Sequence, residues 1–348
     1  STCRQPAEPS ADEGDIMRTR IRTGLLLAAV ASLVVATPAA TAAPSSARTH
    51  HASVIATFGD AESFAESATL DARGNAVVSV THWTEGLGRL YVVSPSGRRT
   101  QFGPDIPLGG CAMLLGVDVD AHGDALVAAF NFGGGDPGCG TDTPATGLLK
   151  VTRTSVSQLT TLPEGSWPNG VEVVGRTAYV TDSLSAGIWR VPADRASAPT
   201  AMWLTSPLLE RVDDADLGLG ANGIVYRDGT LFVTSYAQGL VVTVRVHRDG
   251  TPGAPRVLAS DPQLVTADGI TIGCDGTLWV TATHWTLPDG STDLGHVVTV
   301  SPSGTVRTVA WADGHLDYPT QALLVSGGRL LVVNGSYLNG RPDVTLFG

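Results

Sequence analysis

The feature that most constrains the fold is a repeated pattern of two short apolar strands joined by a tight turn. One copy runs from Ala267 to Trp285, with Asp275-Gly276 at the turn between its strands. Similar copies begin at Asn169-Gly170 and Asn222-Gly223. Apolar runs on both sides of a glycine-containing turn are typical of an antiparallel hairpin. We therefore expect a chain built from repeated antiparallel strand pairs.

Six units can be aligned on this strand pair, and further strands and a polar turn follow each of them. The aligned pairs cover residues 66–80, 116–129, 169–181, 222–234, 268–281 and 321–333. A repeat of about 50 residues with four short strands is typical of propeller blades. We predict an all-β fold, a six-bladed β-propeller with four antiparallel strands per blade. The strand at residues 53–58 is expected to complete the last blade and so close the ring.

The N-terminal segment indicates an exported protein. The first methionine is Met17, and arginines, an apolar run at 25–35 and a small-residue cleavage pattern ending at Ala42 follow it. This order is typical of a secretory signal peptide rather than of a membrane span. We expect residues 1–16 to lie upstream of the natural start and residues 17–42 to be the signal peptide. Residues 43–348 then form a single propeller domain without a membrane span, secreted or extracytoplasmic after cleavage near Ala42.

Composition and motifs exclude several classes of function. The net charge of −11 argues against a nucleic-acid partner, because no basic stripe is present to neutralise phosphates. The sequence has no Gly-x-Ser-x-Gly elbow and no His-Glu-x-x-His helix, which argues against a serine esterase and a zinc protease. In an oxidising compartment Cys111 and Cys139 are expected to form a disulfide.

The candidate site consists of the residue that stands just before the first strand of each unit. We call these the lead residues: Glu66, Leu115, Asn169, Asn222, Asp268 and Thr320. The first strand of a propeller blade faces the central channel, so the lead residues should converge at one mouth of it. Two buried carboxylates there would repel each other, and a hard divalent cation would resolve the conflict by accepting carboxylate and amide oxygens together. Asn-Gly and Asp-Gly are also common turn dipeptides, which is the alternative interpretation.

The order Glu, Asn-Gly, Asn-Gly, Asp-Gly, with Tyr179 to Asp182 ending the third strand pair, resembles the SMP-30/gluconolactonase/LRE-like family. The resemblance covers essentially the expected mature chain. It implies one divalent metal ion in the channel, Ca²⁺ ahead of Mg²⁺, Mn²⁺ or Zn²⁺, held by Glu66, Asn222 and Asp268. Asn169 would lie near both the metal and the substrate. The resemblance also implies hydrolysis of a lactone or related ester, with Asp268 as the general base.

The chain departs from the family pattern at the third unit. Sugar-lactone-hydrolysing members carry an arginine just ahead of the third-unit asparagine, whereas this chain has Trp167-Pro168-Asn169. The departure favours a more apolar or aromatic-stacking substrate, bound by Trp167 and Asn169.

Two histidines are further candidates for catalysis. His82 and His284 each stand sixteen residues after a lead carboxylate, in matching Thr-His-Trp-Thr segments. One interpretation makes them proton shuttles or substrate contacts at the channel mouth. The other interpretation is that the matching segments arose by duplication of a blade and have no catalytic role.

Two alternatives to a hydrolase remain open from the sequence. The first is a non-catalytic propeller that binds a ligand or a protein and holds a structural metal ion in its channel. The second is a lyase-type propeller that opens cyclic ester lactones, although that group resembles a seven-bladed ring and six units are counted here. In the favoured interpretation the protein is a monomer that acts on a small-molecule lactone or ester.

Overall fold

The computed structural model describes residues 51–59, 63–133, 137–196, 200–212, 217–283, 285–286, 292–309, 315–336 and 340–348. All of them belong to one structural unit. The expected upstream segment, the signal peptide and His284 lie outside the described residues. Within the described part, no helix is long and apolar enough to cross a membrane.

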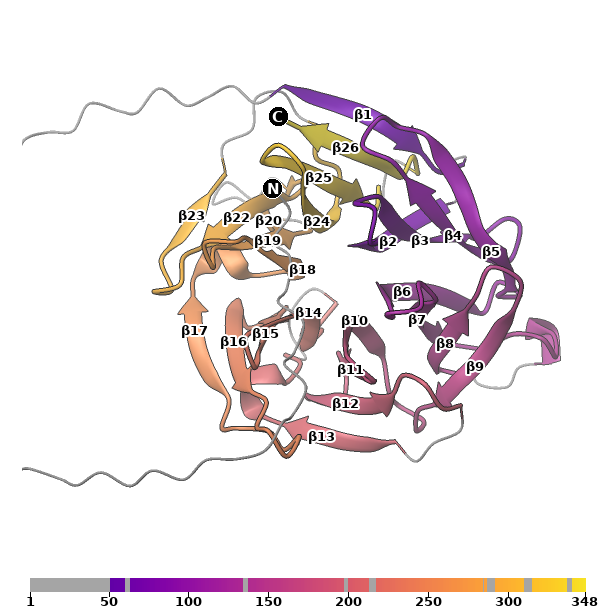
Figure 1. Cartoon of the computed structure of the whole chain (residues 1–348), viewed down its shortest axis with the longest axis horizontal. Helices are drawn as coiled ribbons and strands as arrows, with labels where there is room; N and C mark the ends of the chain where they lie inside the picture. Colours follow the sequence, from indigo (N-terminus) through magenta and orange to yellow (C-terminus); the bar gives the residue numbers. More distant parts are fainter. Residues whose placement is uncertain are drawn as a thin grey trace, which may run out of the picture. The chain divides into compact units, whose positions relative to one another are not determined.

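The chain folds into a six-bladed β-propeller, as predicted, and each blade is a four-stranded antiparallel sheet (Figure 1). The first blade contains β2 (Ser63–Leu70), β3 (Ala76–His82), β4 (Leu87–Val93) and β5 (Arg99–Pro107). The second contains β6 (Ala112–Val119), β7 (Ala125–Asn131), β8 (Gly147–Val151) and β9 (Val156–Thr161). The third contains β10 (Pro168–Val174), β11 (Thr177–Asp182), β12 (Gly187–Pro192) and β13 (Ala201–Thr205).

The remaining blades follow the same order. The fourth contains β14 (Ala221–Arg227), β15 (Thr230–Ser235), β16 (Leu240–Arg245) and β17 (Arg256–Ser260). The fifth contains β18 (Ala267–Ile272), β19 (Leu278–Ala282), β22 (His296–Val300) and β23 (Val306–Thr308). The sixth contains β24 (Pro319–Val325), β25 (Arg329–Asn334), β26 (Asp343–Phe347) and β1 (Ala52–Thr57).

Strand β1 closes the ring. It pairs antiparallel with β26, with Ala52 opposite Phe347 and Thr57 opposite Asp343. The strand predicted at residues 53–58 therefore does complete the last blade. The pairing gives β26 a neighbour on each side, so the sixth blade is built from both ends of the described chain (Figure 1).

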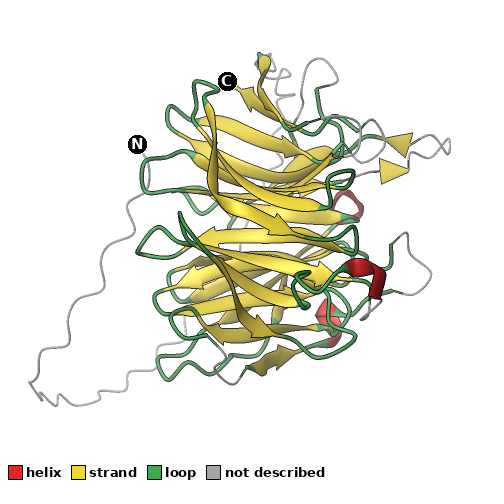
Figure 2. Ribbon diagram, turned by 90° about the vertical axis from the view of Figure 1, so that its right-hand side faces the viewer, coloured by secondary structure: helices red, strands yellow, loops and turns green. Residues whose placement is uncertain are grey.

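The two faces of the ring differ. We call the face on which the first strand of each blade begins the front face, and the opposite face, which carries the tight turns between first and second strands, the back face. Three single-turn 3-10 helices follow strands that end on the front face, which is on the right of Figure 2: η1 (Pro137–Cys139), η2 (Pro207–Leu209) and η3 (Pro262–Leu264). The short pair β20 (Trp285–Thr286) and β21 (Thr292–Asp293) follows β19 on the same face.

The core lies between the blades, and the described residues form one buried apolar cluster for each pair of neighbouring blades. Between the first and second blades, for example, Leu90 and Phe102 pack with Leu114 and Leu149. Burying such a side chain contributes about 1.5–3 kcal/mol relative to leaving it exposed. The blades are thus held together face to face, and their first strands are brought side by side around the channel.

The predicted disulfide between Cys111 and Cys139 is present. It ties the residue before β6 to η1 on the front face. The backbone carbonyl of Cys111 also accepts hydrogen bonds from the amides of Phe132, at 2.9 Å, and Gly133, at 3.3 Å. The loop that leaves β7 is therefore fixed to the start of its own blade.

Glycines after the lead residues allow the first strands of neighbouring blades to approach closely. A Cβ on Gly170 would lie 2.6 Å from the carbonyl oxygen of Asn222, and one on Gly223 would lie 2.3 Å from that of Asp268. Gly116 and Gly269 stand in the same relation to Asn169 and Thr320. Real Cβ atoms do not approach oxygen this closely, so these positions require glycine. In this structure the Asn-Gly and Asp-Gly pairs at the lead positions lie inside first strands and not in turns.

Hydroxyl groups on second strands fix the backbone of the next lead residue. Thr234 Oγ1 donates to the Asp268 carbonyl at 2.8 Å and accepts from the Gly223 amide at 2.7 Å. Ser79, Thr181 and Thr281 donate in the same way to the carbonyls of the lead residues in the next blades, Leu115, Asn222 and Thr320. Each buried hydroxyl therefore links two blades at the channel wall.

We expect Thr234→Val to lower the free energy of unfolding by about 1–3 kcal/mol, because the isosteric side chain leaves the Gly223 amide and the Asp268 carbonyl unpaired in the interior. Thr243→Val is the matched control, since the Thr243 hydroxyl bonds the Arg256 carbonyl at 3.2 Å near the surface. Its effect should stay within about 0.5 kcal/mol. Equal effects of the two substitutions in denaturant unfolding would show that the inter-blade hydroxyl is unimportant.

Candidate functional site

Five of the six lead residues line a single cavity of about 90 Å³ in the channel, and four of them carry a carboxyl or carboxamide group: Glu66, Asn169, Asn222 and Asp268. They come from the first strands of the first, third, fourth and fifth blades. All four are buried, with exposed fractions between 2% and 7%. The structure therefore brings together side chains that are widely separated in the sequence, as the repeat pattern predicted.

The other two lead positions differ in chemistry. Thr320 also lines the cavity, and its hydroxyl donates to the Ala65 carbonyl at 3.1 Å. Leu115 is buried in the apolar cluster between the second and third blades, and Gly116 and Val117 line the cavity in its place. At the lead position, the second blade therefore presents no polar side chain to the cavity.

Hydrogen bonds orient the two carboxamides. Asn169 Nδ2 donates to Ser183 Oγ at 3.2 Å, and Ser183 Oγ donates in turn to the Ala221 carbonyl at 2.8 Å. The Asn222 side chain hydrogen-bonds the Asp268 carboxyl. Because the donor side of Asn169 is engaged, its oxygen is the end of the carboxamide that is available to a cation.

The two lead carboxyl groups are strongly perturbed. Burial raises the pKa of Glu66 to about 8. Burial, and then the charge of Glu66, raise the pKa of Asp268 well above its ordinary value, and the hydrogen bond from Asn222 opposes them. Two acidic groups that share a desolvated site cannot both ionise without a compensating charge.

The residues fit a hard divalent cation. No lysine, arginine or histidine is among the described residues that line the cavity, so no protein cation offsets the carboxylates. Gln321 also lines it, and its Oε1 is buried without a hydrogen-bond partner. Among the described residues, no group of three or more His, Cys, Asp and Glu side chains could hold a metal ion. A cation here would therefore rely on amide as well as carboxylate oxygens, which is the donor set that Ca²⁺ accepts.

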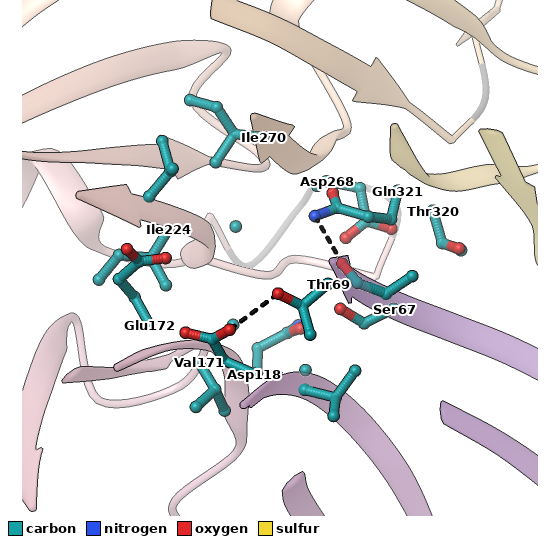
Figure 3. A pocket seen from close by; sticks show the side chains of 18 of the residues that line it. Ser67, Thr69, Asp118, Val171, Glu172, Ile224, Asp268, Ile270, Thr320 and Gln321 are labelled. Carbon is teal, nitrogen blue, oxygen red and sulfur yellow. Dashed lines mark hydrogen bonds between the residues drawn. The ribbon is translucent and has the colours of Figure 1, made fainter. Parts of the chain in front are cut away.

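A second pair of acidic residues lies further along the channel, and the sequence analysis did not identify it. Asp118 accepts a hydrogen bond from Thr69 Oγ1 at 2.8 Å (Figure 3). It also accepts one from the Val173 amide at 2.7 Å, and so bridges three blades. Burial, followed by the charge of Asp118, raises the pKa of Glu172 well above its ordinary value. Their only signal in the sequence is an acidic residue a few positions after a lead residue in two successive units.

The remaining candidates are placed as follows. His82 is buried at the end of β3, with Nδ1 at 2.8 Å from Ser63 Oγ and Nε2 at 3.0 Å from Tyr91 Oη, and it is not among the residues that line the cavity. His284 lies outside the described residues. Trp167 lies on the front face, two residues before Asn169, and its ring stacks on Phe130 with centroids 4.2 Å apart.

Comparisons with solved structures identify similar folds. A gluconolactonase from Xanthomonas campestris is 14% identical, with a TM-score of 0.57 over 86% of this chain and 89% of that one. A luciferin-regenerating enzyme is 12% identical, with a TM-score of 0.58 over 86% and 95%. The chain shares the propeller fold of these proteins. The fold implied by the resemblance to the SMP-30/gluconolactonase/LRE-like family is thus confirmed.

The likeness extends to other propellers and is limited to the fold. A PQQ-bound aldose sugar dehydrogenase from Streptomyces coelicolor is 12% identical, with a TM-score of 0.50 over 86% of this chain and 98% of that one. No protein-family model matches the sequence, and no curated protein does. The activity therefore has to be argued from the site itself.

In the presence of a chelator, we expect the melting temperature to fall as the pH rises from about 5 to 8. Glu66 keeps its proton in the folded chain up to a pKa of about 8, whereas in the unfolded chain it loses the proton near 4.5. The folded state then binds more protons in this range, so stability that is present below pH 4.5 is lost as the pH passes 8. The raised pKa values of Asp268 and Glu172 act in the same direction.

Thermal unfolding across this pH range, with and without Ca²⁺, measures the effect. Added Ca²⁺ should restore stability mainly at the upper end, where it binds carboxylates that have lost their protons. Glu66→Gln removes a titrating group and should flatten the pH dependence. A melting temperature that does not change with pH in the chelated wild type would contradict the assignment.

Proposed function

We propose that the protein is an exported, divalent-metal-dependent hydrolase of a lactone or related ester. The observation that supports this most is the convergence of two buried carboxylates and two carboxamides on one channel cavity, with no lysine, arginine or histidine among the described residues that line it. Such a set costs stability unless it binds a ligand. The solved propellers of similar fold include a gluconolactonase, which is consistent with the proposal.

Glu66, Asn169, Asn222 and Asp268 would hold the metal ion, and their oxygen-only chemistry favours Ca²⁺ over Mg²⁺, Mn²⁺ or Zn²⁺. When bound, the ion supplies Lewis acidity toward an ester carbonyl. The fixed orientation of Asn169 by Ser183 would keep a carboxamide next to both the ion and the substrate.

Asp268 is proposed as the general base. A water molecule adds to the carbonyl carbon of the lactone while the Asp268 carboxylate takes one of its protons. The carbon–oxygen bond of the ring then breaks, and the leaving alkoxide receives the proton from Asp268. The product is the open-chain hydroxy acid, and Asp268 returns to its starting state.

The channel also favours a neutral substrate. Among the described residues, the lining of the cavity includes the carboxyl groups of Glu66, Asp118, Glu172 and Asp268 and no lysine, arginine or histidine. An anionic substrate would therefore find no protein cation to pair with in the channel. An uncharged lactone or ester does not need one.

A binding propeller is the second candidate, and the burial of the proposed ligands favours it. Glu66, Asn169, Asn222 and Asp268 are only 2–7% exposed, as expected of a closed site in which the ion serves structure alone. The six observed blades do not match the seven-bladed ring of the lyase-type alternative.

The proposal also includes export through the expected signal peptide and a monomeric state. The disulfide is consistent with export. Proton transfer by His82 or His284 is a further part of the proposal.

Hydrolysis of a panel of neutral lactones tests the function directly. We expect turnover that is lost in chelator and restored by added divalent metal, and a kcat/KM at least about 100-fold lower for Asp268→Asn. Asp249→Asn, in an exposed turn on the back face, is the matched control and should keep wild-type activity. If metal raises the melting temperature but no lactone or ester turns over, the binding propeller is the correct alternative.

A further inference from the structure

Four aromatic side chains form a continuous row on the front face, which we call the aromatic row: Trp83, Phe132, Phe130 and Trp167. Ring centroids are 6.0 Å apart between Trp83 and Phe132, 6.2 Å between Phe132 and Phe130, and 4.2 Å between Phe130 and Trp167. The last two rings are stacked, with an interplanar angle of 16°. The row crosses the front ends of the first three blades.

The backbone of the row is fixed although part of it faces solvent. Phe132 is 50% exposed, yet its amide donates to the Cys111 carbonyl at 2.9 Å, beside the disulfide. The amide of Trp167 donates to the buried carboxylate of Asp182 at 3.0 Å. An exposed aromatic ring on a fixed backbone loses little entropy when it binds a ligand.

One end of the aromatic row is connected to a lead residue by hydrogen bonds. The amide of Ser183 donates to the Trp167 carbonyl at 2.9 Å, and the hydroxyl of Ser183 accepts from Asn169 Nδ2. Phe130 and Trp167 also pack on the apolar cluster that contains Leu115, the apolar lead residue of the second blade. One end of the row therefore touches the wall of the proposed site.

The row also lies on the side from which a ligand would reach the lead residues. The first strands begin on the front face, so the lead residues lie at the front end of each first strand. Along the side of the second and third blades, the surface that a ligand meets on that face includes the aromatic row.

We propose that the aromatic row determines specificity by stacking against a planar aromatic group of a neutral ester or lactone, whose carbonyl then reaches the lead residues. This inference rests on the proposed function for its reaction and adds the class of substrate. The described lining of the channel has no protein cation to pair with an aromatic acid, and the exposed ring of Phe132 favours a fused or conjugated ring over an aliphatic one.

The first test compares two neutral lactones, dihydrocoumarin as the aromatic substrate and δ-valerolactone as the aliphatic one. We expect Phe132→Ala to lower the ratio of their kcat/KM values by about 3- to 10-fold, through a higher KM for dihydrocoumarin. Phe132→Tyr should retain the ratio. Val257→Ala removes a 46% exposed side chain from the outer strand β17 and serves as the matched control. An unchanged ratio in Phe132→Ala would overturn the proposal.

The second test does not depend on turnover. The lactam analogue of dihydrocoumarin, 3,4-dihydro-2-quinolinone, keeps the planar ring and resists hydrolysis, so its binding can be followed by calorimetry or tryptophan fluorescence. One outcome is that no lactone is hydrolysed but the lactam binds, with an affinity about 3- to 10-fold lower in Phe132→Ala. The aromatic row would then be confirmed as a binding site, and the proposed hydrolase activity would be contradicted. If lactones are hydrolysed but wild type and Phe132→Ala bind the lactam equally, the role of the aromatic row is contradicted and the hydrolase activity is supported.

Discussion

The fold depends on the close contact between the first strands of neighbouring blades. At this contact a glycine in one blade lies against the carbonyl of the next lead residue, and a buried hydroxyl donates to the same carbonyl. A side chain in place of the glycine would separate the strands, and loss of the hydroxyl would leave polar groups unpaired. Because the lead residue is held through its backbone, its side chain is free to project into the channel.

The convergence of the lead residues places two acidic side chains close together in the channel, and the proposed metal site would compensate their repulsion. The ring buries Glu66 and Asp268 in one small cavity, where desolvation and mutual repulsion raise the pKa of both carboxyl groups. The fold is stable enough to bear this cost because apolar clusters join every pair of neighbouring blades in the described structure. A bound cation would convert the destabilising pair into a binding site.

Much of the fold could be predicted from the sequence, because strand pairs, tight turns and the repeat length are local patterns. The closing strand and the Cys111–Cys139 disulfide were predicted as well. The role of the glycines at the lead positions was not predicted. The dipeptide Asn-Gly occurs both in turns and at close contacts between blades, and the sequence does not distinguish the two. The pairing of Asp118 with Glu172 was not predicted, because only the ring brings these two residues together. The buried position of His82 between Ser63 and Tyr91 depends on contacts across strands that spacing alone does not define.

The most direct test of the cation site is calorimetric titration of Ca²⁺ into the metal-free full chain at pH 8. We expect one ion to bind per chain, with affinity at least about 10-fold weaker in Glu66→Gln and in Asp268→Asn, because each substitution removes a charged ligand. Glu172→Gln, which lies in the same channel but outside the lead residues, should bind Ca²⁺ much as the wild type does. Equal affinity in the wild type and Glu66→Gln would contradict a cation held by the lead residues.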